Sequence, residues 1–285
     1  MVLMIYVPLV LIGLCFGSFV NALVWRVYEQ EKENSKKKPD KKYLAKLSIT
    51  KGRSICPHCK HELAVRDLIP VLSWLSLKGK CRYCGKPISA QYPIVELGMV
   101  VLLVGSYLWW PNSFNTTQYE LFGLWVVMMI GFLALTVYDL KWYLLPNRLL
   151  YPLFVPAVAW MAISVSTSHG KGLGYTLAEV VISMVIDGGL FYILYQVSAG
   201  KWIGGGDVRL GWLLGLLALT PARAVLVLFL ASLLGTAFSL PLLVTKKLKR
   251  DSVVPFGPFL LLAAVLVQLF GASLLAWYDR TFLML

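Results

Sequence analysis

The chain has 285 residues, of which 58% are hydrophobic and only 14% are charged. Apolar runs of about 20 residues recur along it, and runs of this length are long enough to cross a bilayer as helices. This composition excludes a water-soluble globular domain and predicts an all-α polytopic membrane protein.

The charge of the chain is basic and unevenly distributed. The formal net charge is +13, and most of it lies in one polar segment, residues 26–92. Nucleic acid could bind such a segment, but anionic lipid headgroups beside a membrane span explain the charge more simply. We therefore expect contact with membrane lipid and no nucleic-acid partner. Because Lys and Arg gather on the cytosolic side of membrane proteins, we place this segment in the cytosol.

The first predicted domain, residues 1–25, is a transmembrane span. It lacks the basic start and the small-residue cleavage site of a signal peptide. Gly17 and Ser18 within it could let another helix approach closely, and this packing interpretation is favoured. Asn21 and Arg26 could instead reach a site at the membrane face.

The second predicted domain, residues 26–92, consists of a basic arm followed by a small polar module. Charged residues run through the arm, at about residues 29–47, with few apolar residues between them. Such a composition indicates a segment that is flexible or that touches lipid.

The module holds two pairs of cysteines with the spacing of metal ligands, in the runs Cys56-Pro57-His58-Cys59 and Cys81-Arg82-Tyr83-Cys84. Each CxxC pair places two thiolates on one side of a turn, and two pairs complete a tetrahedral site that suits zinc. Because four cysteine ligands fill such a site, we expect the zinc to be structural and the nearby His58 and His61 to be bystanders. Thiolate ligands also indicate a reducing compartment.

The third predicted domain, residues 93–285, contains the remaining spans. We expect them at about 94–110, 119–138, 149–166, 175–199, 208–219, 223–244 and 257–277. With the first span this makes about eight, and the one at 208–219 is short for a full crossing. On this topology all but three of the 27 Lys and Arg lie in the cytosol, the exceptions being Lys171, Arg223 and Arg280.

Two acids fall at the cytosolic ends of predicted spans. Asp139 ends one apolar run, and Asp207 follows three glycines, Gly204, Gly205 and Gly206. An acid at the edge of a span is costly to keep charged and is therefore a functional candidate. The glycines would let the backbone turn and come close to another chain.

The placement of the two acids predicts hydrolysis of a peptide bond. Two carboxylates that share a site cannot both ionise easily, so one takes up a proton. The ionised one, of Asp139 and Asp207, can then deprotonate a water molecule while the other polarises the carbonyl group. The alternative is that each acid is a helix-end charge or forms an ion pair with Lys141 or Arg209.

Two further acids lie within or at the start of spans. Asp187 could be a third acid of the site or a buried partner for a polar group on another helix, and its predicted depth favours the structural role. Glu96 follows Tyr92-Pro93 at the start of a span, where the helix dipole favours a carboxylate.

These residues together resemble the type IV prepilin peptidases, the bifunctional leader peptidase/methyltransferases. The resemblance covers most of the chain, and the order and spacing of the motifs make it specific. In the first half the motifs are Gly17-Ser18-Phe19 with Asn21 and Arg26, Gly52-Arg53-Ser54, Asp67-Leu68-Ile69-Pro70, the two CxxC pairs, and Tyr92-Pro93 with Glu96. In the second half they are Asp139, Pro146-Asn147, Gly204-Gly205-Gly206-Asp207-Val208 and Pro255-Phe256-Gly257-Pro258-Phe259.

The resemblance implies a GxGD-type aspartic protease at the inner face of the cytoplasmic membrane, with Asp139 and Asp207 as the catalytic pair and residues 93–285 as the peptidase domain. The implied substrate is a type IV prepilin or a type II secretion pseudopilin, whose short basic leader is cut off after a glycine. The family also methylates the new N-terminus with S-adenosylmethionine, and the resemblance places Glu96, Asn21 and Arg26 near that activity. The basic insertion at 29–47 and Asp187 depart from the family pattern.

Two other functions remain open at this point. The chain could resemble presenilin-like proteases, which also pair two aspartates, but those lack CxxC pairs and carry Pro-Ala-Leu where this chain has Pro255-Phe256-Gly257-Pro258. It could also be a non-enzymatic zinc-knuckle scaffold or a transporter subunit whose acids bind ions or protons. The sequence does not distinguish a monomer from a dimer.

Overall fold

The computed structural model describes residues 2–167, 172–247 and 254–283, and within these ranges the chain is helical apart from loops and two isolated β-bridges. The predicted all-α class is therefore confirmed. Lys171 lies outside the described residues. The chain divides into two compact units, Met1–Leu108 and Trp109–Leu285, and each is described by itself.

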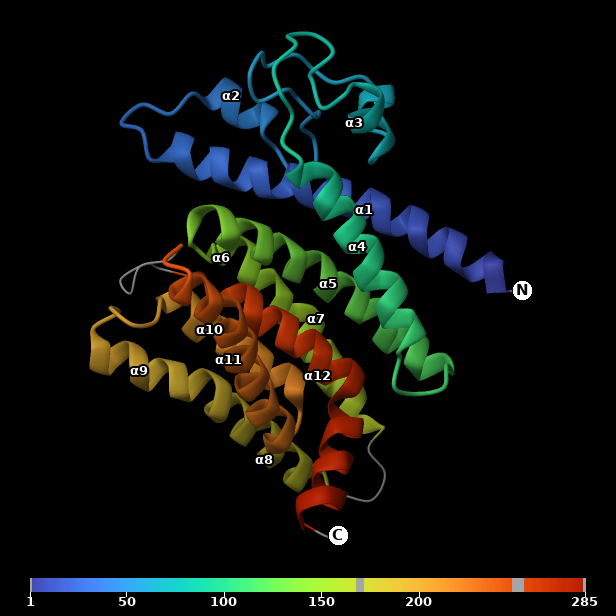
Figure 1. Cartoon of the computed structure of the whole chain (residues 1–285), viewed down its shortest axis with the longest axis vertical. Coiled ribbons are helices and arrows are strands. Elements are labelled where there is room, and N and C mark those ends of the chain that lie inside the picture. The colour runs from blue at the N-terminus through green and yellow to red at the C-terminus, as the bar shows by residue number, and fades with distance from the viewer. Residues whose placement is uncertain (1, 168–171, 248–253, 284–285) are drawn as a thin grey trace. The chain divides into compact units, whose positions relative to one another are not determined.

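Unit 1, Met1–Leu108, consists of two long helices and the polar module between them (Figure 1). Its elements are α1 (Val2–Asn34), α2 (Lys41–Lys46), the 3-10 turn η1 (Val65–Asp67), α3 (Leu72–Ser76) and α4 (Gln91–Leu108). Gly17 lets α1 and α4 come into close contact, because a Cβ atom at this position would lie 2.5 Å from the Cα of Glu96. The packing interpretation of Gly17 agrees with this contact.

The first half of the basic arm is helical and packed against the rest of unit 1, which corrects the expectation that it is flexible. The helix α1 continues to Asn34 because polar side chains of its last turns are buried against the rest of the unit. The Gln30 side-chain amide donates to the carbonyl of Leu47 at 2.8 Å. The Glu33 carboxylate accepts a hydrogen bond from the backbone N–H of Asp40, whose own side chain caps α2.

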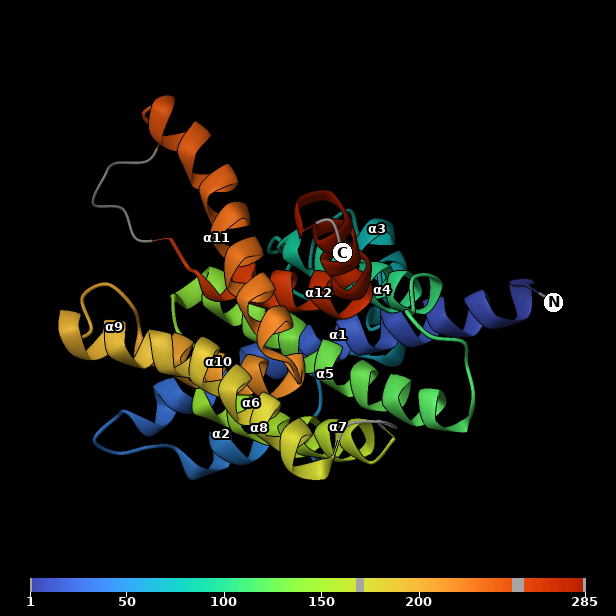
Figure 2. The ribbon, with the colours of Figure 1, turned by 90° about the horizontal axis from the view of Figure 1, so that it is seen from below.

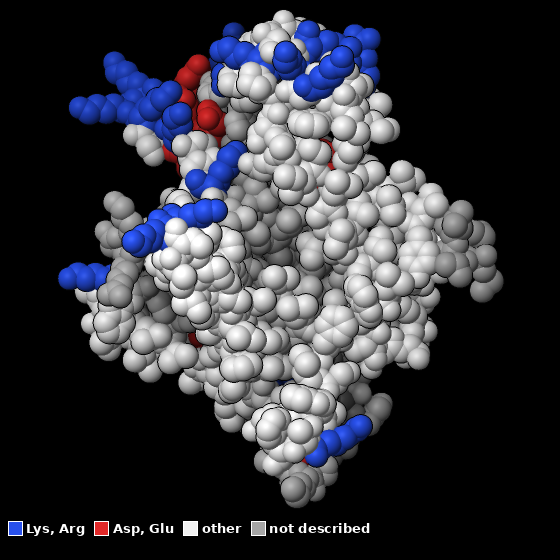
Figure 3. All heavy atoms as spheres, viewed as in Figure 1, with Lys and Arg blue, Asp and Glu red and all other residues white. Residues whose placement is uncertain are grey.

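Charge in unit 1 is concentrated in the segment between α1 and α4. In the space-filling view Lys and Arg side chains gather over this segment (Figure 3). The visible surface of the helices in unit 2 shows few charged side chains (Figure 3). This distribution follows the sequence, because the long apolar runs of the second half contain few charged residues.

Unit 2, Trp109–Leu285, is a bundle of helices. Its elements are α5 (Thr116–Trp142), α6 (Asn147–Leu150), the 3-10 turn η2 (Tyr151–Leu153), α7 (Phe154–Ser166), α8 (Leu173–Met184), the π-helical turn η3 (Val185–Gly189), α9 (Leu190–Ser198), α10 (Gly205–Ala218), α11 (Pro221–Val244), α12 (Gly257–Tyr278) and the π-helical turn η4 (Asp279–Leu283). Consecutive elements such as α8, η3 and α9 form one continuous helical segment.

Seven helical segments of the described residues are long and apolar enough to cross a membrane. They account for seven of the eight expected spans. The expected span at 208–219 is α10, which has 14 residues and is therefore about 21 Å long. This is less than the roughly 30 Å thickness of a hydrocarbon core, but most of α10 is buried among the other helices of its unit.

Three helix ends of unit 2 meet at the loop after α5. A Cβ atom at Gly206, in the first turn of α10, would lie 2.8 Å from the Cβ of Leu145. A Cβ atom at Gly257, the first residue of α12, would lie 3.4 Å from the Cδ2 of the same leucine. Both α10 and α12 begin beside this loop. The chain therefore leaves this end of the bundle along α10 and returns to it along α11. The end of α11 extends beyond the helices around it (Figure 2).

Candidate functional site

The four cysteines of the module come together in unit 1. The Sγ atoms of Cys56, Cys59, Cys81 and Cys84 all lie within 4.8 Å of one another, and those of Cys56 and Cys84 are 4.0 Å apart. Four ligands at a Zn–S distance of about 2.3 Å would stand a little under 4 Å from each other, so the cluster fits a tetrahedral metal ion.

Both cysteine pairs have the same backbone. Each forms a short antiparallel turn, closed by the bridge between Ile55 and Glu62 in the first pair and by that between Lys80 and Pro87 in the second. The residue after the second cysteine has a positive φ in both, 59° at Lys60 and 69° at Gly85. The CxxC spacing therefore produces two similar turns that face each other across the cluster.

Asp67 holds the second cysteine turn in place. Its carboxylate accepts hydrogen bonds from the Nε of Arg82 at 2.7 Å and from the hydroxyl of Tyr83 at 2.9 Å. Burial raises the pKa of this carboxyl, but the two donors and the backbone N–H of Ala64 outweigh burial and hold the pKa below its usual value. Both side chains between Cys81 and Cys84 are thereby fixed, a role that the sequence had not indicated.

Arg26 and Asn21 bind backbone groups of their own unit. The Arg26 guanidinium donates to the carbonyls of Ser48, Ile49 and Gly52 at 2.9–3.2 Å and so holds the chain that leads into the first cysteine pair. The Asn21 side chain donates to the carbonyl of Tyr92 at 3.1 Å and so ties α1 to α4.

Glu96 is buried in the second turn of α4, with 6% of its surface exposed. Its carboxylate accepts the backbone N–H of Val71 at 2.7 Å, just before α3, and the Ser18 side chain also binds it. The structure thus brings Glu96 next to the first span, where the sequence had placed the polar residues Asn21 and Arg26. These three residues all connect α1, α4 and the module.

Asp139 and Asp207 are brought together in unit 2. Asp139 lies in the last turn of α5 and is 5% exposed, and Asp207 lies in the first turn of α10. The charge of Asp139 acts on the carboxyl group of Asp207. Two acids that are 68 residues apart in the sequence therefore share one end of the bundle.

The start of α12 completes the surroundings of Asp139. The backbone N–H of Gly257 donates to the carboxyl group of Asp139, and a Cβ atom at Gly257 would lie only 2.6 Å from its Oδ2. The sequence motif includes Gly257 but does not link it to the aspartates. The run Pro255-Phe256-Gly257-Pro258 indicates only that a helix begins here, because proline is favoured in the first turn of a helix.

The suggested ion pairs of the aspartates are absent from the described ranges of the chain. The Arg209 guanidinium donates instead to the side-chain oxygen of Asn147 at 2.6 Å and joins α10 to the start of α6. The Lys141 ammonium lies 5.0 Å from the ring centre of Trp142. Within the part of the chain that the structure describes, the two acids thus stand together without an ion-paired Lys or Arg.

The three glycines before Asp207 differ in how tightly they are packed. Gly204 is the extended residue before α10, and Gly205 and Gly206 begin the helix. Only Gly206 lies in tight contact, against Leu145, whereas a Cβ atom at Gly205 would lie 3.7 Å from the ring of Tyr195. Close approach therefore explains Gly206, and the space beside Gly205 is open enough for a small side chain.

Asp187 lies in the π-helical turn η3 and is 1% exposed. Neither of its carboxyl oxygens has a hydrogen-bond partner among the described residues. Its backbone carbonyl packs against Gly211 of α10, one turn beyond Asp207. The structure therefore does not give Asp187 the buried polar partner that the structural interpretation required.

Comparison with known proteins gives matches over nearly the whole chain. The model described as "Bacterial Peptidase A24 N-terminal domain" matches residues 11–110, and the one described as "Type IV leader peptidase family" matches residues 126–240. The two matches fall on either side of the boundary between unit 1 and unit 2.

Several curated proteins are similar to the chain over most of their length. A protein of Aeromonas hydrophila named "Prepilin leader peptidase/N-methyltransferase" is 32% identical and covers 96% of this chain and 93% of its own. A "Type 4 prepilin-like proteins leader peptide-processing enzyme" of Escherichia coli O78:H11 is 31% identical over 89% of both chains. A relative from Pseudomonas aeruginosa is 28% identical over 94% of this chain and 91% of its own. No solved structure matches the chain.

Proposed function

The chain belongs to the type IV leader peptidase family, and on this premise we propose that it removes the leader of prepilins or pseudopilins and methylates the new N-terminus. The observation that carries the peptidase activity is the pair of carboxyl groups, Asp139 and Asp207, at the meeting point of α5, α10 and α12. Both acids lie within the segment that matches the leader peptidase family, residues 126–240.

The two carboxyl groups act by activating water. Because two negative charges that share a site repel each other, one carboxyl group carries the proton and the other is ionised. The ionised group removes a proton from a water molecule, which attacks the scissile carbonyl carbon, and the protonated group donates a hydrogen bond to the carbonyl oxygen. The N–H of Gly257 keeps Asp139 in position during this step.

The substrate reaches this site at the cytosolic face of the cytoplasmic membrane. A prepilin carries a basic leader in the cytosol and an apolar helix in the bilayer, so the bond between them arrives at the membrane surface. Asp139 and Asp207 lie at the ends of α5 and α10, and the basic loops beside these ends indicate the cytosolic side. The extended backbone at Gly204 can pair with an extended substrate segment.

The thiol cluster holds a zinc ion with a structural role. Cys56, Cys59, Cys81 and Cys84 supply all four ligands of a tetrahedral ion, which leaves no open position for a substrate. The ion holds together a module that has little other secondary structure.

Methylation takes place at unit 1. S-adenosylmethionine supplies the methyl group when it is bound. The buried carboxylate of Glu96 is the residue of this unit placed to accept the proton that the pilin amine loses. Asn21 and Arg26 act as positioning residues, because they hold α4 and the start of the module on α1.

The purified protein, in detergent or lipid, is incubated with a prepilin that carries its leader, and the product masses are read with and without S-adenosylmethionine. Removing a carboxyl group that takes part in proton transfer lowers the rate about 10²–10⁴-fold, so Asp139→Asn and Asp207→Asn should each abolish leader loss. Glu96→Gln should still release the leader but add no methyl group.

Bound zinc and a melting curve serve as the folding control for each variant. Leader release at the wild-type rate by either aspartate variant would contradict the assignment of the pair. If wild type cleaved none of several prepilins while holding zinc and a native melting transition, the peptidase function itself would be wrong.

A further inference from the structure

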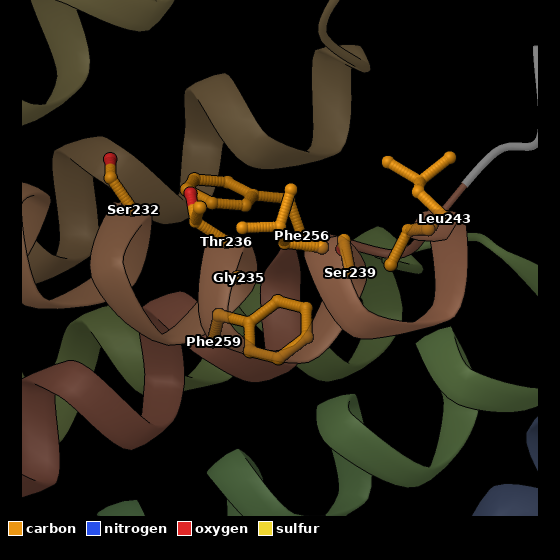
Figure 4. A pocket seen from close by; sticks show the side chains of 9 residues that line it. Ser232, Gly235, Thr236, Ser239, Leu243, Phe256 and Phe259 are labelled. Atoms are coloured by element: carbon orange, nitrogen blue, oxygen red, sulfur yellow. The ribbon is translucent and has the colours of Figure 1, made fainter. Parts of the chain in front are cut away.

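A groove lies on unit 2 between α11 and the segment that leads into α12 (Figure 4). Its volume is about 420 Å³. One wall is a stripe of α11, formed by Ser232, Gly235, Thr236, Ser239, Leu240 and Leu243. The other wall consists of Val254, Phe256 and Phe259.

Four residues of this stripe are small, and three of them carry a hydroxyl group, whereas most of α11 is apolar. Ser232, Gly235, Thr236 and Ser239 are spaced by three and four residues and so share one face of the helix. Small residues at this spacing let a second helix come close. The hydroxyl groups of the stripe have no hydrogen-bond partner among the described residues.

Of the seven candidate spans, α11 is covered least by the protein. Only 11% of its most apolar stretch is buried, compared with 28% or more in each of the other six. Unpaired hydroxyl groups in a bilayer are costly, and acyl chains offer them no partner. A helix that carries a few polar or small side chains can both fill the groove and bind these hydroxyl groups.

The groove and the aspartate site share the start of α12. Phe256 forms part of its wall, and the next residue, Gly257, donates its N–H to Asp139. Phe256 also packs edge-to-face with Phe191, at a centroid distance of 6.1 Å. A helix in the groove therefore contacts the residue next to the glycine that binds Asp139.

We propose that this groove binds the apolar helix of the prepilin, the part of the substrate that follows the scissile bond; this rests on the proposed peptidase function. From Leu243 to Ser232 the groove wall extends about 16 Å along α11. That is about half of a roughly 30 Å hydrocarbon core, so the groove holds the first three turns of the substrate helix. None of the described residues that line it is charged, so the face of the helix bound against them is uncharged.

The groove can be filled without touching the aspartates. A Cβ atom at Gly235 would lie 3.6 Å from the rings of Phe256 and Phe259, which is ordinary contact. Gly235→Ala should therefore be tolerated, whereas the larger side chain of Gly235→Leu should occupy the groove. Ala237→Leu is the matched control, because Ala237 is exposed in the same turn of α11 and does not line the groove.

The experiment measures cleavage of two substrates. One is a full-length prepilin in lipid, and the other is a short peptide with the leader and cleavage junction but without the apolar helix. We expect Gly235→Leu to lower kcat/KM for the full-length substrate at least tenfold, mainly through KM, and to leave the short peptide unchanged. Ala237→Leu, which lies outside the groove, should cleave both substrates within about twofold of the wild-type rate.

A photocrosslinking side chain at position 239, replacing Ser239, tests binding independently of cleavage, with position 237 as its control. We expect crosslinks to the prepilin from position 239 alone. Crosslinks only to lipid or to a second copy of the chain would overturn the proposal. The proposal would also be overturned if Gly235→Leu lost activity equally toward both substrates, or if it cleaved the full-length substrate at the wild-type rate. If wild type crosslinked the prepilin but cleaved nothing, the peptidase function would fail while the groove assignment stood.

Discussion

The thiol cluster of unit 1 and the aspartate pair of unit 2 differ in how far along the chain their members lie. Each cysteine pair is closed within a single short turn, and its geometry follows from local backbone hydrogen bonds. Asp139 and Asp207 lie on separate helices and meet only because α5, α10 and α12 end or begin beside Leu145. A local site of this kind depends on its ligand for stability, whereas an assembled site depends on the packing of the bundle.

The largest effect is expected when the metal is removed, because this should unfold the module that holds the thiol cluster and leave the aspartate pair of unit 2 intact. Zinc binding to a structural site contributes on the order of 10 kcal/mol, so Cys84→Ser or a strong chelator should unfold the module. Trypsin should then cut between residues 50 and 92 while unit 2 stays intact, as read by mass spectrometry of the fragments. Cys15→Ser is the control, since Cys15 lies outside the cluster. Retained zinc and protease resistance in Cys84→Ser would show that the four thiols are not the metal ligands.

The next effect tests whether the assembled site depends on close packing. In Gly257→Ala the added Cβ atom would lie 2.6 Å from the Oδ2 of Asp139 and must displace this carboxyl group. A displacement of about 1 Å costs on the order of a hundredfold in rate, so kcat for leader removal should fall by about that factor. Gly123→Ala, with no atom within 4 Å of its new Cβ, should leave the rate unchanged. Similar rates for both variants would contradict a role for Gly257 in positioning Asp139.

A smaller effect distinguishes two neighbouring glycines of α10. Gly206→Ala places a Cβ atom 2.8 Å from the Cβ of Leu145, whereas Gly205→Ala meets nothing closer than 3.7 Å. We expect Gly206→Ala to lower cleavage about tenfold by shifting Asp207, and Gly205→Ala to change it by less than threefold. Initial rates with one prepilin, together with melting temperatures, would measure both. The reverse order would mean that Gly205 serves the substrate backbone rather than the packing of α10.

The smallest effect concerns the local site. Asp67→Asn weakens the hydrogen bonds from Arg82 and Tyr83, and a bond to a charged group is worth about 1.5–3 kcal/mol. The variant should therefore lower the melting temperature of the module by a few degrees at pH 7 and keep its zinc.

The pH dependence of this effect follows from the pKa of Asp67. Because the pKa is lower in the folded protein than its ordinary value of 3.8, the stabilisation is complete above that value. It is lost as the pH falls through the folded pKa. Wild type and Asp67→Asn should thus differ equally at pH 6 and pH 8. A difference that appeared only below pH 4 would contradict the lowered pKa.

The sequence predicted those features that depend on composition or on short spacing. Apolar runs predicted the helical class and seven of the candidate spans, and the CxxC spacing predicted the cluster of four thiols. The two aspartates were predicted to face each other because the predicted topology put both at the same side of the membrane. Topology alone was sufficient for that inference.

The sequence did not predict features that depend on tertiary contacts. The charged sequence after residue 28 predicts a flexible or lipid-touching arm. In the structure this segment is the end of α1, and its residues Gln30 and Glu33 are buried against the chain that follows. The contact between Gly257 and Asp139 joins residues more than a hundred positions apart, and no local sequence pattern predicts it. The position of Asp187 beside Gly211 likewise depends on how η3 packs on α10.

The residue after the second cysteine is Lys60 in the first turn and Gly85 in the second, although both have a positive φ. A lysine adopts this conformation at a cost that a glycine does not incur. The ammonium group of Lys60 offsets this cost by contacting the Tyr43 hydroxyl at 2.8 Å and by lying 5.7 Å from the ring centre of Trp25 on α1. Unfolding of this turn on loss of a bound metal ion should therefore change the surroundings of the Trp25 indole, and the fluorescence of Trp25 should report it.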